Sequence, residues 1–209
     1  MHNLHIGVDL DNTLINYDHV FAEVGVEIGL LPADYDHGAK EEIKAYLFSS
    51  PGGEEDWMRL QGQVYGRNIG RAKLFEGAED FLKTACLNGA RVSIVSHKTR
   101  YGHFDPDRID LWDAALDWLD SRDFFGANGL DLDPNDVHFR ETLDGKIEQI
   151  SEIGCKFFVD DLPRVLNHER FPSNVGKFWF ASTQAARAGC GLVPYRSWAE
   201  VKSELEKNL

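Results

Sequence analysis

The stretch HIGVDLDNTL, residues 5–14, decides the fold. A short apolar run ends on Asp9, and a second aspartate, Asp11, follows in the turn beyond it. Apolar runs of this length are typical of parallel sheets, whose strands are buried on both faces. Ligands bind such sheets beyond the carboxyl ends of the strands. The stretch therefore predicts a buried first strand that places Asp9 and Asp11 at a ligand-binding edge.

Further short apolar runs recur along the chain, and helical patterns separate them. The run at 91–95 ends before Ser96, and the run at 156–159 ends before Asp160. Two more runs lie at 137–139 and 177–180. Strands that alternate with helices predict an α/β fold with a doubly wound parallel sheet, covered by helices on both faces.

Three of the intervening helices carry signals at their ends. Asp105-Pro106 is typical of a helix start, because proline suits the first helical position. Thr142 begins a second helix, whose apolar stripe is closed by Gly154. Ser197 and Glu200 form a capping box ahead of the last helix.

Residues 15–73 interrupt this alternation, because they contain helical patterns and no convincing strand. The helical patterns lie at 20–30, 41–48 and 54–66, with a Ser-Ser-Pro-Gly-Gly breaker at 49–53. We expect an all-helical insertion at 15–73 that covers the site as a cap, the alternative being a surface elaboration without catalytic purpose. The core is then formed by 1–14 and 74–209.

Two pairs of aspartates follow strand ends. Asp9 and Asp11 form the first pair, and Asp160 and Asp161 form the second. Carboxylates this close repel each other unless a cation or a proton lies between them. If the two strands are neighbours, four carboxylates converge on one point. A hard divalent cation with oxygen ligands would neutralise them, and Mg2+ is the cation we expect.

Ser96 and Lys146 supply complementary groups at the same edge of the sheet. Ser96 ends a strand and offers a hydroxyl and a backbone amide to an anion. Lys146 lies in the first turn of the helix that leads into the Asp160 strand. A lysine, a hydroxyl and a divalent cation beside an aspartate suit phosphoryl transfer, in which positioning and charge neutralisation provide most of the catalysis.

With these residues in this order, the chain resembles the haloacid dehalogenase superfamily of phosphohydrolases. The matching segments are Asp9-Leu10-Asp11-Asn12-Thr13-Leu14, Val95-Ser96, Lys146 and Phe158-Val159-Asp160-Asp161. The resemblance implies that Asp9 attacks phosphorus and forms an aspartyl-phosphate. It implies that Asp11 protonates the leaving alcohol and then activates water. It also implies that Ser96 and Lys146 bind the phosphoryl group and that Thr13 braces the turn.

The resemblance assigns Mg2+ to the Asp9 carboxylate, the Asp11 backbone carbonyl and Asp160, with Asp161 binding directly or through water. Asp11 excludes the dehalogenase branch, which lacks an acid at that position and needs no metal. The fourth motif places its two acids side by side, whereas the commoner pattern separates them by several residues. Lys98 and Arg140 remain alternatives to Lys146 for the cationic role.

Composition limits the partners and the compartment. The 209 residues include 22 Lys plus Arg and 35 Asp plus Glu, a net charge of -13, which argues against nucleic acids and anionic membrane surfaces. No apolar run approaches the ~18 residues that a membrane span needs. We expect a cytoplasmic protein in which Cys86, Cys155 and Cys190 are reduced.

The leading hypothesis is a magnesium-dependent phosphomonoester hydrolase that acts on a small phosphorylated metabolite, such as a sugar phosphate or nucleotide. His97, Lys98 and Arg67 are candidates for the substrate pocket. One alternative is a phosphotransferase or mutase of the same superfamily. The other is a non-catalytic phosphoryl-switch or binding module. A receiver-like switch would carry its acceptor aspartate in the middle of the chain, and not on the first strand.

Overall fold

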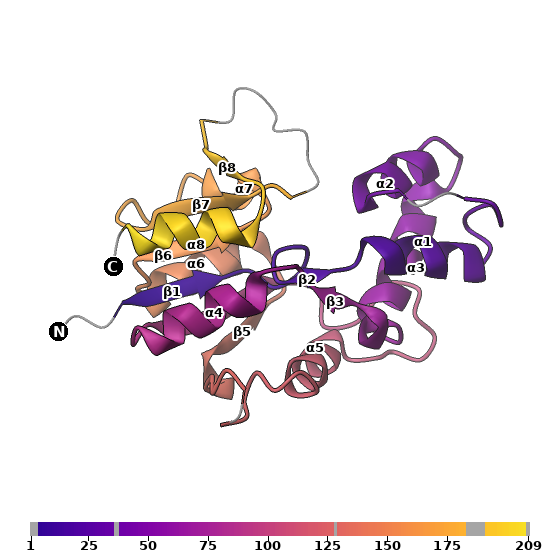
Figure 1. The fold of residues 1–209 in the computed structure, drawn as a ribbon. Coiled ribbons are helices and arrows are strands. Elements are labelled where there is room, and N and C mark those ends of the chain that lie inside the picture. Colours follow the sequence, from indigo (N-terminus) through magenta and orange to yellow (C-terminus); the bar gives the residue numbers. More distant parts are fainter. Residues whose placement is uncertain (1–3, 36–37, 128, 183–190, 208–209) are drawn as a thin grey trace. The chain divides into compact units, whose positions relative to one another are not determined.

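The core of the protein is a six-stranded parallel sheet with strand order β5-β4-β1-β6-β7-β8 (Figure 1). This computed structural model describes residues 4–35, 38–127, 129–182 and 191–207. The neighbours of β1 are β4 on one side and β6 on the other. The strands are β1 (His5–Val8), β4 (Arg91–His97), β5 (Val137–Arg140), β6 (Phe157–Asp160), β7 (Gly176–Phe180) and β8 (Pro194–Tyr195).

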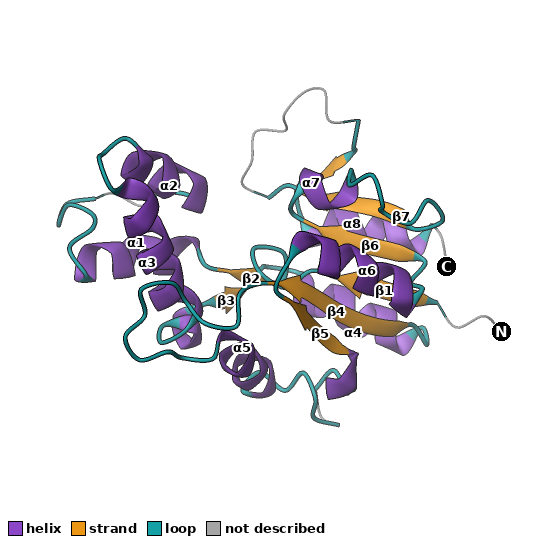
Figure 2. Cartoon of the chain, turned by 180° about the vertical axis from the view of Figure 1, so that it is seen from behind, coloured by secondary structure: helices purple, strands orange, loops and turns teal. Residues whose placement is uncertain are grey.

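Helices cover both faces of this sheet, as a doubly wound fold requires. Helices α4 (Ala78–Leu87) and α8 (Trp198–Glu206) lie on one face, and α6 (Leu143–Ile153) lies on the other (Figures 1 and 2). The short helix α7 (Pro163–Leu166) shares a buried apolar cluster with α6. The predicted fold class is confirmed.

Two short elements of the sheet unit were not predicted from the sequence. They are η2 (Pro134–Asp136), which precedes β5, and the edge strand β8.

Helix α6 has the two end signals that the sequence indicates. The Thr142 side chain accepts a hydrogen bond of 3.1 Å from the backbone N–H of Gly145. Gly154 follows the last residue with a φ of 61°, in the left-handed region that glycine adopts without strain. These ends fix where the first turn lies, and therefore where Lys146 emerges.

A second compact unit is helical and packs around aromatic side chains. Phe21 stacks on Trp57 with ring centroids 5.1 Å apart, and Tyr17 meets Tyr65 edge-on at 4.9 Å. Its helices are α1 (Asp18–Glu27), α2 (Lys40–Phe48), α3 (Gly53–Tyr65), η1 (Ile69–Arg71) and α5 (Leu111–Asp120).

The division into units differs from the division expected from the sequence at Ile15 and at residues 99–122. The sheet unit contains residues 1–15, 74–98 and 123–209, and the helical unit contains residues 16–73 and 99–122. The short strands β2 (Ile15–Asn16) and β3 (Lys73–Leu74) pair where the chain passes between the units. Residues 99–122, which we had assigned to the core, therefore form a second segment of the helical unit.

The helix expected to begin at Asp105-Pro106 begins later. Asp105 accepts hydrogen bonds from the backbone N–H groups of Asp107, at 3.2 Å, and Ile109, at 2.9 Å, which builds a turn. Asp110 is the N-cap of α5, because its side chain accepts from the N–H groups of Trp112 and Asp113. An aspartate before a proline suits a turn as well as a helix start, and the turn prevails here.

Two remaining expectations concern cysteines and membranes. Cys86 and Cys155 are free thiols, and Cys190 lies outside the described residues. Burial raises the pKa of Cys155 to about 11, so this thiol is protonated at neutral pH. Within the described residues, no helix combines the length and apolar character needed to cross a bilayer.

Candidate active site

The acidic residues meet where β1 and its neighbour β6 end. Asp9 directly follows β1, and Asp160 is the last residue of β6. The two strands pair in register, with Val8 opposite Val159, and the Asp9 N–H donates to the Val159 carbonyl at 2.9 Å. Asp9 is 4% exposed and Asp160 is fully buried. The expected convergence of strand ends therefore exists, inside the protein and not on its surface.

Lys146 lies between these two carboxylates. Its Nζ is 2.5 Å from Asp9 Oδ1 and 2.6 Å from Asp160 Oδ2. Burial of the ammonium group opposes its charge, but the charges of Asp160 and Asp9 more than offset this and raise the pKa of Lys146. The lysine is therefore a fixed cation at the site.

The single positive charge of Lys146 faces two carboxyl groups, those of Asp9 and Asp160. Burial is the main effect that raises the pKa of Asp160, to about 7, and the charge of Asp9 acts in the same direction. Lys146 and a hydrogen bond of 2.8 Å from the Leu162 N–H to Asp160 Oδ1 oppose this rise. A carboxyl group in this position favours a further cation or a proton.

Thr13 joins the two acidic pairs, as its expected bracing role requires. Its hydroxyl donates to Asp9 Oδ2 at 2.8 Å and accepts from the Asp161 N–H at 3.1 Å. The turn that returns Thr13 to the site contains Asn12 with a φ of 62°, a left-handed conformation that asparagine tolerates better than most residues. Thr13 is fully buried, so its bonds hold the first and fourth motifs together away from water.

Both carboxylate oxygens of Asp11 contact side chains from the end of β4. Lys98 Nζ is 2.9 Å from Asp11 Oδ1, and the Ser96 hydroxyl donates to Asp11 Oδ2 at 3.1 Å. Ser96 and Lys98 lie two residues apart on an extended segment, so their side chains share one face. The structure thus brings Ser96 to the site, with its hydroxyl bonded to Asp11.

The donor set of the site fits a divalent cation. Asp9, Asp160 and Asp161 each offer a carboxylate oxygen, and these oxygens lie within 4.8 Å of one another. Four carboxylates, with Asp11, face the two ammonium groups of Lys98 and Lys146. Oxygen ligands with excess negative charge are those that Mg2+ prefers.

The other predicted site residues have different surroundings. His97 lies between Ser96 and Lys98, and its pKa is lowered to about 4, first by burial and then by the charge of Lys146. Arg140, one alternative for the cationic role, bonds Gln149 and the Phe139 carbonyl. Arg67 lies in the helical unit, where it pairs with Asp107.

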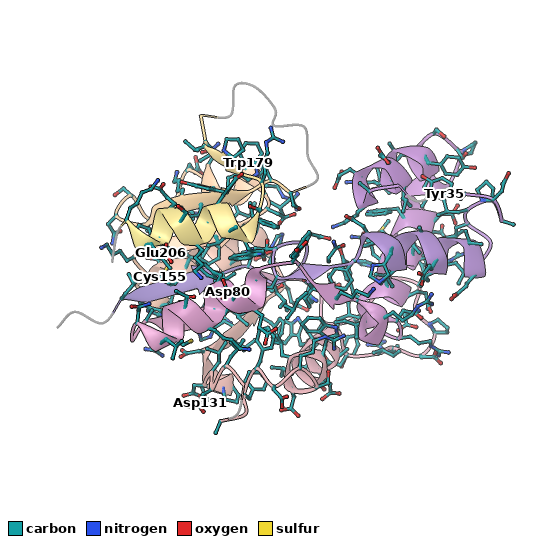
Figure 3. The ribbon with its side chains drawn as sticks, in the orientation of Figure 1. Tyr35, Asp80, Asp131, Cys155, Trp179 and Glu206 are labelled. Carbon is teal, nitrogen blue, oxygen red and sulfur yellow. The ribbon has the colours of Figure 1, made fainter. Side chains whose placement is uncertain are left out.

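Two tryptophans support the site from the side of the core and were not found from the sequence. The indole N–H of Trp179, on β7 (Figure 3), donates to the Asp161 carbonyl at 3.1 Å. The indole N–H of Trp198 donates to the Thr13 carbonyl, also at 3.1 Å. No sequence signal separates these two from ordinary core aromatics, because the contact of Trp179 depends on register across the sheet and the contact of Trp198 depends on how α8 packs.

Comparisons with known proteins bear on the fold. No family model matches the sequence, and no curated protein matches it. A haloacid dehalogenase-like hydrolase from Burkholderia xenovorans LB400 matches with a TM-score of 0.63 and 12% identity over 100% of both chains. A predicted phosphoglycolate phosphatase from Haemophilus somnus 129PT has a TM-score of 0.59 and 13% identity, over 100% of this chain and 99% of that one.

A third solved structure contains a ligand. A HAD family hydrolase from Deinococcus radiodurans R1, with bound phosphate and sodium, has a TM-score of 0.55 and 15% identity, over 98% of this chain and 96% of that one. These likenesses confirm the resemblance expected from the motifs. The chain has the fold of the haloacid dehalogenase superfamily of hydrolases.

Proposed function

We propose that the protein is a magnesium-dependent phosphomonoesterase that acts through an aspartyl-phosphate on Asp9. The observation that carries this proposal is the contact of buried Lys146 with both Asp9 and Asp160, with an oxygen of Asp161 close by. A nucleophilic carboxylate needs its charge neutralised before it can approach a phosphate dianion. The arrangement supplies one fixed cation and the ligands for another.

In the proposed first step, an Asp9 carboxylate oxygen attacks phosphorus and the bond to the leaving alcohol breaks. Asp11 gives its proton to the alcohol oxygen and becomes a carboxylate. Thr13 bonds the Asp9 oxygen that Lys146 does not contact, so it sets the direction in which the nucleophile points. The products are a free alcohol and phosphorylated Asp9.

In the second step, water attacks phosphorus and the bond to Asp9 breaks. The ionised Asp11 takes the proton of the water, so the starting state returns and inorganic phosphate leaves. Asp9, Asp160, Asp161 and the Asp11 backbone carbonyl would hold Mg2+, which when bound neutralises charge on the phosphoryl oxygens. Lys146 keeps the Asp9 carboxylate oriented throughout.

The positive charge available at the site indicates how much negative charge a substrate can carry there, and so indicates the substrate class. Two cations suit one phosphoryl group of a small metabolite, and the overall charge of -13 disfavours a polyanion. The phosphate bound in the Deinococcus protein supports the same class. We propose that the helical unit acts as a cap that selects the leaving group, with Arg67 as a candidate residue, and that His97 lines the phosphoryl end next to Lys98, whose ammonium group contacts Asp11.

Phosphate release from a panel of phosphorylated metabolites, with Mg2+ and with chelator, tests the function. We expect steady release with Mg2+, little with chelator, and none from Asp9→Asn, which keeps the shape but lacks the nucleophile. Full activity in Asp9→Asn contradicts the nucleophile assignment. A long-lived phosphoprotein without released phosphate would instead favour a phosphoryl switch, and phosphoryl transfer to a second metabolite would favour a mutase.

A further inference from the structure

We propose that Lys98 is a positioning residue that holds Asp11, and that it does not serve as a phosphate ligand. This inference rests on the proposed function, because it concerns how Asp11 performs its second role. Among the described ion pairs, Lys146 contacts Asp9 and Asp160, whereas Lys98 contacts Asp11. Its carboxylate is oriented instead by the end of β4.

The contact between Lys98 and Asp11 is short and sheltered. The Nζ of Lys98 is 2.9 Å from Asp11 Oδ1, with side chains 6% and 15% exposed. Exposed ion pairs contribute little because water screens them and their side chains lose entropy, whereas sheltered pairs are screened less. The Ser96 hydroxyl holds the second oxygen of Asp11 at 3.1 Å, so the plane of the carboxylate is defined by two donors.

The backbone around both partners is also fixed. The Lys98 N–H donates to the Arg140 carbonyl at 2.9 Å, which extends the pairing of β4 and β5 by one residue. On the other side, the Asn12 N–H donates to the Ile15 carbonyl at 2.9 Å and closes the turn that carries Asp11. Two anchored backbones joined by an ion pair leave the Asp11 carboxylate little freedom.

This arrangement matters most for the second half of the reaction. There the ionised Asp11 must take a proton from water as the water oxygen attacks phosphorus and the bond to Asp9 breaks. The Lys98 ammonium group and the Ser96 hydroxyl direct the oxygens of this carboxylate. Without Lys98, an activated ester should still phosphorylate Asp9, because its leaving group needs no proton, but the aspartyl-phosphate should hydrolyse slowly.

The test compares rapid-mixing kinetics of p-nitrophenyl phosphate with Mg2+ in the wild type, Lys98→Met and Asp11→Asn. We expect both variants to release about one equivalent of nitrophenolate rapidly and then to turn over about 100-fold or more slowly, the scale of a general base. The double variant should lose little more than either single variant. Lys98→Arg should recover part of the steady rate, since it retains the charge.

Arg140→Met is the matched control, because it removes a cation from the neighbouring strand whose guanidinium bonds Gln149. We expect wild-type kinetics from Arg140→Met.

The proposal is overturned if Lys98→Met slows both phases equally. It is also overturned if Lys98→Met raises KM and the inhibition constant of inorganic phosphate while kcat stays unchanged. Lys98→Gln replaces Lys98→Met if the latter does not fold. Full activity in Asp9→Asn would refute the proposed function separately.

Discussion

Thr13 shows how single side chains set the geometry of the site. Its hydroxyl lies between Asp9 and the backbone of Asp161, so one buried oxygen joins the nucleophile to the metal-binding motif. Thr13 itself carries no charge, so it can be replaced without changing the net charge of the site. It is therefore the residue at which positioning can be measured separately from electrostatics.

We expect Thr13→Val, which keeps the shape and removes the hydroxyl, to lower kcat by roughly 10- to 100-fold, the usual loss when a partner of a metal ligand is removed. The Asp161 N–H also loses its acceptor, which should cost about 1–3 kcal/mol of unfolding free energy. Steady-state kinetics and urea denaturation measure the two effects. Thr13→Ser is the control, and a loss in Thr13→Ser equal to that in Thr13→Val would contradict the bridging role.

The sequence predicted which acids would meet but not how each is held. Asp9 and Asp160 meet because parallel strands end at one edge, a rule that needs no side-chain detail. Lys146 follows from the start of α6, which Thr142 marks. Strand alternation puts Lys98 on the same face as Ser96, but it does not tell which acid the Lys98 side chain contacts, so the contact with Asp11 was not predicted.

At the scale of elements, the ends of helices and strands decide where functional side chains emerge. Helix α6 starts and stops where Thr142 and Gly154 require, whereas α5 starts five residues later than the Asp105-Pro106 signal indicates. The difference has a local cause, because the Asp105 side chain accepts hydrogen bonds from the backbone N–H groups of Asp107 and Ile109 and so closes a turn. A capping residue marks the start of a helix only where its side chain does not form a turn instead.

Gly154 allows the end of α6 to be tested. We expect Gly154→Ala to lower the unfolding free energy by about 1 kcal/mol, because its φ of 61° strains a residue with a Cβ. No heavy atom lies within 4 Å of the added Cβ, so a clash cannot explain the loss. Gly70→Ala has the same open space without the positive φ and should be neutral or stabilising. Equal effects of the two substitutions in urea denaturation would contradict this explanation.

The amino-terminal end of β4 carries a pH-dependent pair. The Arg91 guanidinium contacts Asp136 at 2.6 and 2.9 Å. Burial alone would raise the pKa of Asp136, but the hydrogen bonds and charge of Arg91 prevail and lower it below its ordinary value of 3.8. The unfolded state then binds the proton more readily, so this stabilisation is present above pH 3.8 and is lost as the pH falls through the folded pKa.

We therefore expect Asp136→Asn to destabilise the protein at neutral pH and to differ less from the wild type in acid. Urea denaturation at neutral pH and near pH 3, below the ordinary aspartate pKa, measures this difference. Asp80→Asn is the control, because its ion pair with Lys202 is largely exposed. A difference between Asp136→Asn and wild type that grows in acid would contradict the pairing.

At the scale of the whole molecule, the buried acids among the described residues are Asp9 and Asp160 at the proposed site and Asp105 and Asp136 elsewhere in the fold. The chain carries a net charge of -13, and the acids to which we assign a function are those at the ends of β1 and β6. The helical unit contains residues 99–122, which the sequence pattern placed with the sheet. Their helical pattern could not reveal which unit they join, because that depends on tertiary packing.

A binding cation should stabilise the whole fold. We expect Mg2+ at about 100 times its dissociation constant to add about 2.7 kcal/mol and to raise Tm by roughly 5–10 °C. Asp161→Asn should reduce this shift, whereas Asp120→Asn, which alters an exposed residue of α5, should leave it unchanged. Thermal unfolding with and without Mg2+ measures the shift without any substrate. An undiminished shift in Asp161→Asn would contradict its place among the metal ligands.

The proposed function requires that Asp9 is phosphorylated during turnover. The most direct measurement is acid quenching of the enzyme during turnover with Mg2+, followed by mass spectrometry of its peptides. We expect one phosphoryl group on the peptide that contains Asp9. The phosphorylated fraction of this peptide should be larger in Asp11→Asn and zero in Asp9→Asn. Phosphate release without any phosphorylated peptide, or a phosphoryl group on another residue, would contradict this expectation.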